Sequence, residues 1–276
     1  MGIAGTPELK NFKPVAKNVI DALKLKGADY VLEEHAAKGL GEQGIPLSKM
    51  KVDVVITIGG DGTILRTLQG TDLPILGVNA GVLGFLTEVK PDEVASAITK
   101  LLSGKYSIDE RIKLKTVMDG KRFEDATNET VIHTAQIAKL RHFTISVDGT
   151  HATEMRADGI IIATPTGSTC YAMSVGSSII DPRVEALVFA PIAPFRLSAR
   201  PLVVPAKSKI SVSLRDPKPC SLVVDGQCQR EMKGDETIVF TASEKKARFV
   251  TFNKDDFYIN LEEKLMAWSP YAVQRQ

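Results

Sequence analysis

Cysteine is scarce in this sequence, which has only Cys170, Cys220 and Cys228 among its 276 residues. A sparse and odd number of cysteines argues against a disulfide framework and against a cysteine-based zinc site. Cys220 and Cys228 flank the turn signal Asp225-Gly226, and a two-residue hairpin there would place Cys228 opposite Val223 rather than opposite Cys220. We therefore expect three thiols without disulfide bonds.

Long apolar runs and an excess of one charge are also lacking. No apolar run could span a bilayer, and the first residues lack the basic segment and apolar core of a secretory signal. Lysine and arginine total 35 against 33 aspartates and glutamates, so neither nucleic acid nor a membrane is an expected partner. Apolar residues make up 43% of the chain, enough to bury a core. We expect a globular cytoplasmic protein of one large or two ordinary domains.

The most informative stretch covers residues 54–63 and reads Val-Val-Ile-Thr-Ile-Gly-Gly-Asp-Gly-Thr. Its first half predicts a buried parallel strand, and three glycines in four positions allow a sharp turn close to a ligand. Thr63 could cap a helix that continues through apolar residues. A strand, a glycine turn and a helix N-terminus together form an anion site, because unpaired N–H groups and the helix dipole favour phosphate.

Asp61 lies in the middle of this glycine turn, where its carboxylate would repel a phosphate. It could instead bind a ribose hydroxyl, accept a proton or meet a metal ion. The plainer interpretation is a tight turn in which Asp61 caps the helix. The segment is neither the Gly-x-Gly-x-x-Gly fingerprint nor a Walker-type loop. The choice between a functional and a purely structural Asp61 therefore depends on residues elsewhere in the chain.

Strands and helices are expected to alternate over the first hundred residues. Residues 13–25 have helical apolar spacing that ends at Gly27, and residues 90–102 begin with Pro91 and acidic side chains, which suits a helix start. Strands are expected at residues 28–34, 54–58 and 74–79, and an irregular connection over 36–48. This alternation predicts a small N-terminal α/β domain with a parallel sheet.

Beyond Tyr106 the pattern changes to short β-rich runs separated by turn signals such as Asp119-Gly120 and Asp148-Gly149. Examples of the expected strands are residues 114–118, 143–147, 160–164, 187–190, 202–204, 209–214, 222–224 and 237–240. The pattern predicts a larger C-terminal domain that resembles a β-sandwich. We expect the α/β domain to cover residues 1–106 and the β-rich domain residues 107–253. A tail over 254–276, helical over 257–268, should pack back on the α/β domain.

Four further segments carry polar residues where a plain strand would not, at residues 126–129, 156–159, 165–174 and 224–227. Each has an ordinary explanation as a surface turn, a bulge, a helix cap or a hairpin tip. By the same reasoning Arg66 and Lys139 are solvated surface charges, and Tyr171 is a core residue. Each segment is therefore weak evidence alone.

In combination and in this order, these segments resemble the NAD kinase family, whose members phosphorylate the adenosine ribose 2′-hydroxyl of NAD to give NADP. The Gly-Gly-Asp-Gly element alone is shared with diacylglycerol and sphingosine kinases and with phosphofructokinases. Asn128-Glu129 and the Thr-Gly-Ser-Thr-x-Tyr segment make the resemblance specific. The matching stretches cover nearly the whole chain, at residues 59–63, 78–86, 128–129, 158–159, 164–169 and 197–202.

The resemblance implies a role for each matched position. Asp61 matches the catalytic aspartate that accepts the hydroxyl proton, Gly62 beside it binds the dinucleotide, and Asn128 and Glu129 match a pair that contacts this ligand. Cys170 stands where the family usually has alanine. The other NAD-binding residues implied are Arg66, Lys139, Arg156, Asp158, Thr169, Cys170, Tyr171, Ala172, Met173, Ser174, Ala193 and Gln227.

The resemblance also implies the cofactors and partners. ATP or polyphosphate would donate the phosphoryl group, cradled by the backbone at Gly59, Gly60, Gly62 and Thr63. The sequence has no obvious protein metal cage, so Mg²⁺ would arrive with the nucleotide phosphates. The expected partners are NAD, NADP, ATP and further copies of the chain in a homodimer or homotetramer, with residues 191–194 at a subunit contact.

Other functions stay open at this point. A lipid kinase could share the glycine–aspartate loop, but it would need an apolar entry patch and would not require Asn128-Glu129. A non-catalytic dinucleotide-binding regulator is a different class, and Asp61 argues against it, because a sensor gains nothing from a carboxylate in a phosphate loop. A purely structural β protein is a third possibility. It would give no reason for the glycine-rich and hydroxyl-rich segments, which are locally unfavourable for stability.

Overall fold

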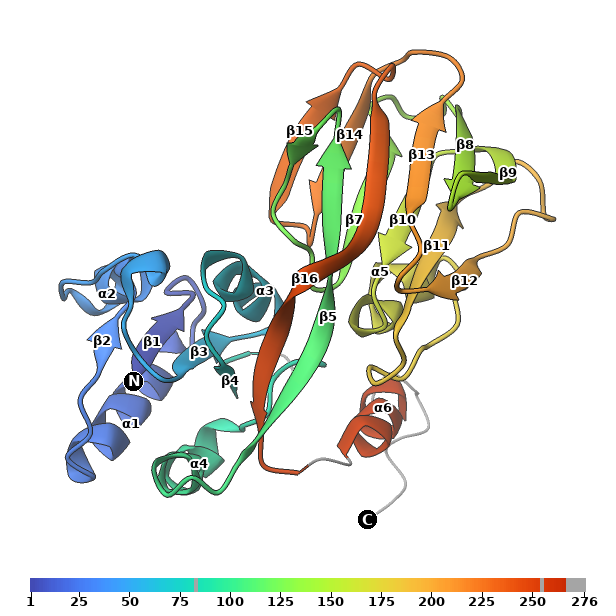
Figure 1. Cartoon of the computed structure of the whole chain (residues 1–276). Helices are drawn as coiled ribbons and strands as arrows, with labels where there is room; N and C mark the ends of the chain where they lie inside the picture. Colours follow the sequence, from blue (N-terminus) through green and yellow to red (C-terminus); the bar gives the residue numbers. More distant parts are fainter. Residues whose placement is uncertain (82–83, 254–255, 267–276) are drawn as a thin grey trace. The chain divides into compact units, whose positions relative to one another are not determined.

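The computed structural model describes residues 1–81, 84–253 and 256–266 (Figure 1). The chain divides into an α/β unit, Met1–Glu110 with Arg248–Gln276, and a β unit, Arg111–Ala247. The sequence analysis placed this division after residues 106 and 253. None of the described helices is long and apolar enough to cross a membrane.

The α/β unit is built on a parallel sheet in the order β2–β1–β3–β4. These strands cover Val31–Leu32, Gly2–Gly5, Val55–Gly59 and Ile75–Asn79. Every residue of β3 and β4 is buried, which explains why both strands are mostly apolar. The predicted parallel α/β sheet is therefore confirmed, although β2 is shorter than the strand expected at residues 28–34.

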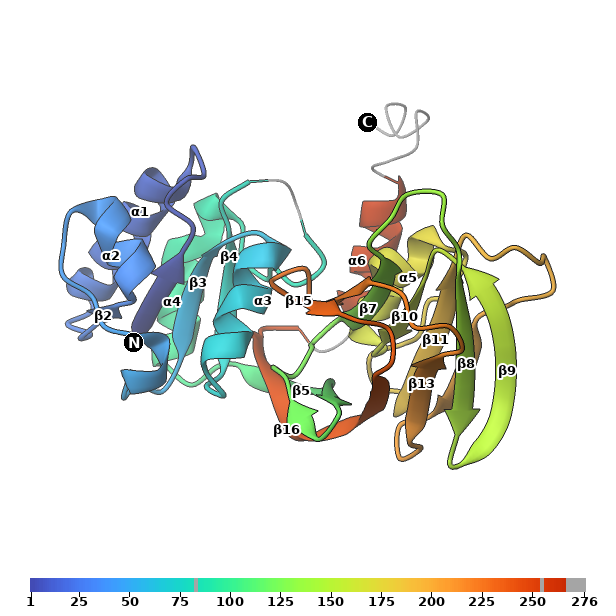
Figure 2. The same cartoon turned by 90° about the horizontal axis from the view of Figure 1, so that it is seen from above.

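Helices cover both faces of this sheet, and Figures 1 and 2 show α1 and α4 on one side and α3 on the other. Apolar residues of α1 and α4, including Val19 and Ile98, share one buried cluster with Ile56 and Ile58 of β3. This packing stabilises the unit by removing both apolar helix faces from water. The helices of the unit are α1 (Phe12–Leu25), α2 (Glu34–Leu40), α3 (Asp61–Gly70), α4 (Val94–Leu102) and α6 (Asp256–Met266).

The irregular connection expected over residues 36–48 was wrong in its first part, which forms helix α2. The Glu33 carboxylate caps this helix by accepting the Ala36 N–H at 3.1 Å, and Gly41 ends it with a φ of 74°. A short 3₁₀ turn follows at Leu47–Lys49. Another 3₁₀ turn, Pro91–Glu93, leads into α4 and confirms the helix start expected near Pro91. Residues 267–268 of the predicted tail helix lie outside the described residues.

The β unit contains two antiparallel sheets that enclose one core. The first has the order β12–β11–β10–β7–β14–β15. Its strands cover Leu202–Pro205, Ala186–Ile192, Gly159–Ala163, Glu129–Thr134, Cys220–Val224 and Cys228–Met232. The second contains β6 (Lys121–Arg122), β8 (Arg141–Val147), β9 (Thr150–Ala157) and β13 (Ile210–Leu214). It also contains most of β5 (Ser107–Met118) and of β16 (Thr237–Thr251), whose remaining residues belong to the α/β unit.

The core between these sheets confirms the predicted sandwich-like architecture. Ile132, Ile160 and Phe189 of the first sheet are buried in one cluster with Phe143 and Phe240 of the second. The outer face of the first sheet holds a smaller apolar cluster, in which Ala172 of helix α5 (Tyr171–Ser174) packs with Ile161, Ala163 and Val188. Because β10 is buried on both faces, its sequence is apolar throughout.

The hairpin between β14 and β15 differs from the predicted one by a single residue. Val224 pairs with Cys228, so three residues, Asp225, Gly226 and Gln227, form the turn instead of two. Cys228 therefore lies opposite Val224 and not Val223, and Cys220 pairs with Met232. All three cysteines lie in the described chain and remain thiols.

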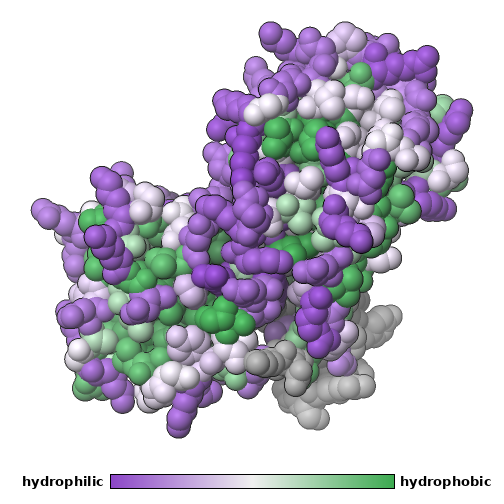
Figure 3. Space-filling view, in the orientation of Figure 1, coloured by the Kyte–Doolittle hydropathy of each residue, from purple (hydrophilic) through white to green (hydrophobic). Residues whose placement is uncertain are grey.

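On the face drawn in Figure 3, hydrophilic side chains are spread over the surface of both units, with smaller groups of hydrophobic side chains among them.

Candidate functional site

The glycine turn joins β3 to α3 at the carboxyl edge of the parallel sheet. Helix α3 begins at Asp61 with Gly60 as its N-cap, so the cap predicted at Thr63 was wrong. The Thr63 hydroxyl instead lies 2.7 Å from the Thr6 hydroxyl, and its N–H donates to the Gly60 carbonyl at 3.0 Å. A Cβ at Gly59 would lie 2.2 Å from Thr63 Oγ1, so this position requires glycine.

The two remaining glycines of the turn have free space where a side chain would lie. A Cβ at Gly60 or at Gly62 would meet no atom of the described structure within 4 Å. Both lie at the first turn of α3, where backbone N–H groups lack partners inside the helix. The positive end of the helix dipole lies at the same place. Gly60 and Gly62 can therefore admit an anion close to the backbone.

The Asp61 carboxylate is held by the backbone of the loop that follows β4. Oδ2 accepts the Phe85 N–H at 2.7 Å, and Oδ1 accepts the Leu86 N–H at 2.9 Å. A Cβ at Gly84 would lie 2.0 Å from Asp61 Oδ1, so glycine lets this loop approach the carboxylate. Each oxygen still has a second lone pair for a ligand donor. Asp61 therefore does not cap its own helix but is oriented from another loop.

The sequence analysis did not identify this contact, although it included residues 78–86 in the resemblance. The groups that hold Asp61 are backbone N–H groups, which no residue type reveals. The one available signal was the glycine at position 84. Val82 and Leu83 of the same stretch lie outside the described residues.

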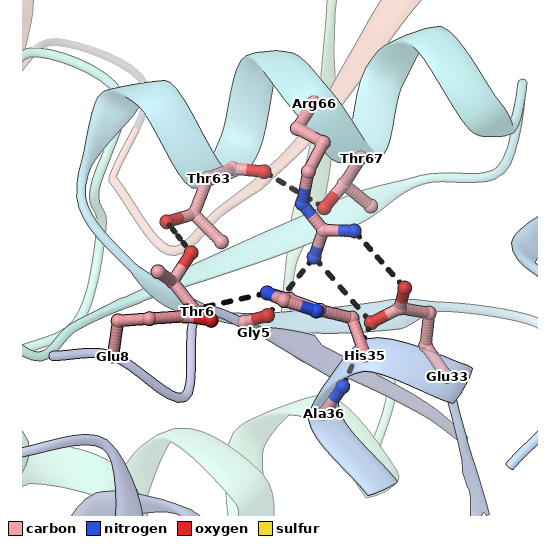
Figure 4. Close-up of polar contacts among 9 residues, drawn as sticks. All are labelled: Gly5, Thr6, Glu8, Glu33, His35, Ala36, Thr63, Arg66 and Thr67. Atoms are coloured by element: carbon pink, nitrogen blue, oxygen red, sulfur yellow. Dashed lines mark hydrogen bonds and ion pairs between the residues drawn. The ribbon is translucent and has the colours of Figure 1, made fainter. Parts of the chain in front are cut away.

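Arg66, one turn further along α3, is engaged inside the α/β unit (Figure 4). Its guanidinium donates to Glu33 Oε1 at 3.0 Å and to the Gly5 carbonyl at 2.9 Å. Burial opposes ionisation of Glu33, but its hydrogen bond to Arg66 and the Arg66 charge outweigh this and hold its pKa below the ordinary value. Arg66 is thus not the solvated surface charge of the default interpretation, because it joins α3 to β1 and to the cap of α2.

In the β unit, Asn128 and Glu129 form no surface turn. They are 4% and 9% exposed, at the start of β7. The Asp225 carboxylate holds their backbone: Oδ2 accepts the Thr127 N–H at 2.7 Å, and Oδ1 accepts those of Asn128 at 2.8 Å and Glu129 at 3.1 Å. The Asp225 N–H returns a bond to the Glu129 carbonyl at 2.9 Å. Asp225 therefore fixes the conformation of the Asn-Glu pair.

Asp225, whose sequence context indicated only part of a hairpin tip, is the residue that holds the Asn-Glu pair. The sequence feature that could have identified it is a carboxylate directly after the apolar strand β14. In the structure Asp225 is 4% exposed. Burial raises the pKa of Asp225 to about 6, although the three N–H donors favour its charged form. Burial, together with the nearby Asp225 carboxylate, raises the pKa of Glu129 to about 8.

The hydroxyl-rich turn after β10 packs against the same pair. The Thr164 hydroxyl donates to the Thr127 carbonyl at 2.6 Å, and the Thr164 N–H donates to the Asn128 carbonyl at 2.8 Å. A Cβ at Gly167 would lie 2.3 Å from that carbonyl. The Asn128 amide donates to Cys170 Sγ at 3.3 Å, while its Oδ1 has no partner among the described residues. The structure thus brings Asn128, Glu129, Cys170 and Asp225 together.

Residues 171–174 follow as helix α5, in which Ala172 is buried and Tyr171 is 39% exposed. Tyr171 is therefore not the core residue of the default interpretation. Thr169, just before the helix, donates its hydroxyl to the Thr166 carbonyl at 3.2 Å. Met173 is half-buried and Ser174 is exposed. Both apolar and polar side chains of α5 are therefore accessible to solvent.

The remaining predicted residues lie elsewhere in the β unit. Asp158 separates β9 from β10, and its N–H donates to the Ile192 carbonyl at 3.0 Å, beside Ala193 with its φ of 44°. The Arg156 guanidinium lies 5.4 Å from the ring centre of Phe195. Lys139 and Gln227 are exposed in loops. No cluster of three or more His, Cys, Asp or Glu side chains that could hold a metal occurs in the described residues.

Comparison with known proteins identifies relatives that match both units. The family model of the ATP-NAD kinase N-terminal domain matches residues 10–106, and that of the C-terminal domain matches residues 127–252. The chain is 40% identical to an NAD kinase of Thermoplasma volcanium, with 94% of this chain and 95% of the relative covered. It is 44% identical to an NAD kinase of Methanothermobacter thermautotrophicus, with 96% of each covered.

Solved structures show the same fold. The yeast NADH kinase complexed with NADH has a TM-score of 0.89 at 24% identity, with 99% of this chain and 89% of that one covered. An Archaeoglobus fulgidus NAD kinase in complex with ATP has a TM-score of 0.79 at 28% identity, with 97% and 99% covered. Family matches over both units and relatives of nearly the same length show that this chain belongs to the NAD kinase family.

Proposed function

We propose that this NAD kinase transfers the terminal phosphoryl group of ATP to the 2′-hydroxyl of the adenosine ribose of NAD, with Asp61 as the group that positions the hydroxyl and takes its proton. The products are NADP and ADP. The main support for this proposal is the geometry of the Asp61 carboxylate. Two backbone N–H groups orient it, and each of its oxygens keeps a lone pair for a ligand donor. Phosphoryl transfer depends on such positioning of the nucleophile more than on covalent chemistry.

The donor phosphates would lie at the N-terminus of α3. Gly60 and Gly62 leave space there, and the helix dipole favours negative charge. Thr63 would contribute less than the sequence suggested, because its hydroxyl and N–H already have partners within the protein. Arg66 would act on the dinucleotide indirectly, by holding α3 in place, because its guanidinium is bound to Glu33 and Gly5. The A. fulgidus relative in complex with ATP supports ATP as the donor.

The dinucleotide would bind to the β unit around Asn128 and Glu129. The unpartnered Asn128 Oδ1 offers an acceptor for a ligand N–H, and the exposed Tyr171 ring offers an apolar surface for a base. Asp158, Arg156 and Ala193 lie near the other end of β10, and the resemblance implies that they also contact the dinucleotide. The further predicted contacts are Lys139, Thr169, Cys170, Ala172, Met173, Ser174 and Gln227.

A divalent cation such as Mg²⁺ would arrive bound to the donor phosphates. The described residues offer no cluster that would hold it through protein ligands alone, and Mg²⁺ commonly binds through one or two carboxylates and substrate phosphates. When bound, the cation would neutralise developing charge on the phosphates. The cytoplasmic location and the homodimer or homotetramer stay predictions.

The test is to incubate the purified chain with NAD, Mg²⁺ and either ATP or polyphosphate, and to follow NADP with an NADP-specific dehydrogenase. We expect NADP with ATP, and the parallel reaction shows whether polyphosphate also serves. Binding of NAD without NADP from either donor would support a regulator instead. A lack of NAD binding would contradict the proposed site itself.

A further inference from the structure

Glu129 has a carboxyl group that no described residue of the protein neutralises. The side chain is 9% exposed, and its Oε2 atom is buried without a hydrogen-bond partner among the described residues. A buried carboxylate is costly unless it is paired with a cation or accepts hydrogen bonds. Within the described chain, Glu129 forms no ion pair, so it lacks both forms of stabilisation.

The elements around Glu129 supply one negative charge and no direct positive one. On its own sheet, β10 and β14 carry only uncharged side chains, and the turn of residues 164–169 is uncharged as well. The ionisable group that acts electrostatically on Glu129 is the Asp225 carboxylate, directly after β14. Lys113 of β5 acts electrostatically on Asp225.

Asp225 is the member of this pair that must stay ionised. Its two oxygens accept three backbone N–H groups, and Lys113 adds favourable electrostatics. A proton on Asp225 would displace or weaken one of these bonds. Two carboxylates that share a site cannot both ionise easily, so the proton belongs on the group without donors, which is Glu129. The raised pKa of Glu129, about 8, agrees with this assignment.

We propose that Glu129 binds the dinucleotide as a neutral carboxylic acid that donates a hydrogen bond to an acceptor oxygen of the ligand, and not as a carboxylate that accepts one. This inference rests on the proposed function, since it assigns the protonation state of a residue at the same site. The ligand group it selects is a hydroxyl, carbonyl or phosphate oxygen. Asp225 is a positioning residue in this arrangement, because it acts through the backbone of Asn128 and Glu129.

The test is the pH dependence of NAD binding, measured by calorimetry for the wild type and for Glu129→Gln. Glutamine keeps an N–H donor but cannot ionise. We expect Glu129→Gln to bind NAD within about threefold of the wild type near neutral pH. Above about pH 8 the wild-type Kd should rise by up to about tenfold per pH unit, while the Glu129→Gln value stays flat. Glu231→Gln, at an exposed position of β15, is the matched control and should keep the wild-type profile.

Two results would overturn the inference while leaving the proposed function intact. One is a loss of NAD affinity of more than about tenfold in a folded Glu129→Gln variant near neutral pH, as expected for an anionic ligand contact. The other is a wild-type Kd that stays constant to about pH 9.5, a measurement that needs no variant. A wild-type chain that binds no NAD at any pH would overturn the proposed function, and the inference with it.

Discussion

At the scale of single residues, we expect turnover to depend on the orientation of the Asp61 carboxylate by the loop after β4. Gly84→Ala tests this orientation without changing Asp61, because the added methyl would lie 2.0 Å from Asp61 Oδ1 and displace it. Misplacement of a catalytic group by about 1 Å can cost about 100-fold in rate. We expect a loss of kcat of about that size, measured by NADP formation.

The matched control lies in the same loop. A Cβ at Gly81 meets no atom of the described structure within 4 Å, so Gly81→Ala should leave kcat nearly unchanged. Equal rates for the two alanine variants and the wild type would show that the contact between Asp61 and the loop is unimportant for turnover.

The protonation of Glu129 also predicts how stability changes with pH. Its pKa in the folded chain is about 8, above the ordinary value of 4.5, so the folded state holds a proton that the unfolded state releases. This contribution to stability is complete below about pH 4.5 and is lost as pH rises to about 8. The free energy of unfolding, from urea titrations, should therefore fall more steeply between about pH 5 and about pH 8 in the wild type than in Glu129→Gln. Parallel pH dependences would contradict the assigned proton.

At the scale of elements, Arg66 connects α3 to β1 and α2. Arg66→Met would leave the 6%-exposed Glu33 without its cation, and an unpaired buried carboxylate is destabilising. Since Arg66 is partly exposed, we expect a loss of about 1–3 kcal/mol in the free energy of unfolding. The double variant Arg66→Met with Glu33→Gln should recover part of the loss. A single variant as stable as the wild type would contradict this role.

The elements also show what the sequence could and could not predict. Buried parallel strands such as β3 and β4 were predictable because every residue is buried and most of them are apolar. Helix α2 was missed because its seven residues, Glu34–Leu40, include a glycine and span too few turns for a clear periodicity. The start of β7 was interpreted as a surface turn because it lies at the polar residues Asn128 and Glu129, whose burial depends on the distant Asp225.

For the site, the sequence could predict residue types but not their connections. The resemblance identified Asp61, Asn128 and Glu129, yet the groups that hold them are Phe85, Leu86 and Asp225, the last of which lies 97 residues beyond Asn128. Contacts of this kind depend on tertiary structure, and backbone donors leave no trace in residue identity. The predicted register of the β14–β15 hairpin was wrong by one residue for a similar reason. The length of the turn depends on the backbone conformation at Asp225 and Gly226, which both have positive φ.

At the scale of the whole molecule, the predicted self-association has a physical basis in strand β12. This strand ends the order of the first sheet, and its Leu202 and Val203 are 46% and 48% exposed. Exposed apolar side chains on an edge strand favour association. Light scattering should give the mass of a dimer or tetramer, and Val203→Lys should lower it. Its control, Glu231→Lys, lies on the edge strand β15 and should leave the mass unchanged. A monomeric wild type would contradict the prediction.

The most direct test of Asp61 as the proton acceptor compares the wild type with Asp61→Asn in the presence of NAD, ATP and Mg²⁺. Asparagine keeps the shape of the side chain and can still accept one backbone N–H, but it cannot take a proton from the ribose hydroxyl. We predict that the wild type forms NADP, and that Asp61→Asn still binds NAD by calorimetry while forming almost none. An Asp61→Asn variant that turns over at nearly the wild-type rate would contradict Asp61 as the proton acceptor.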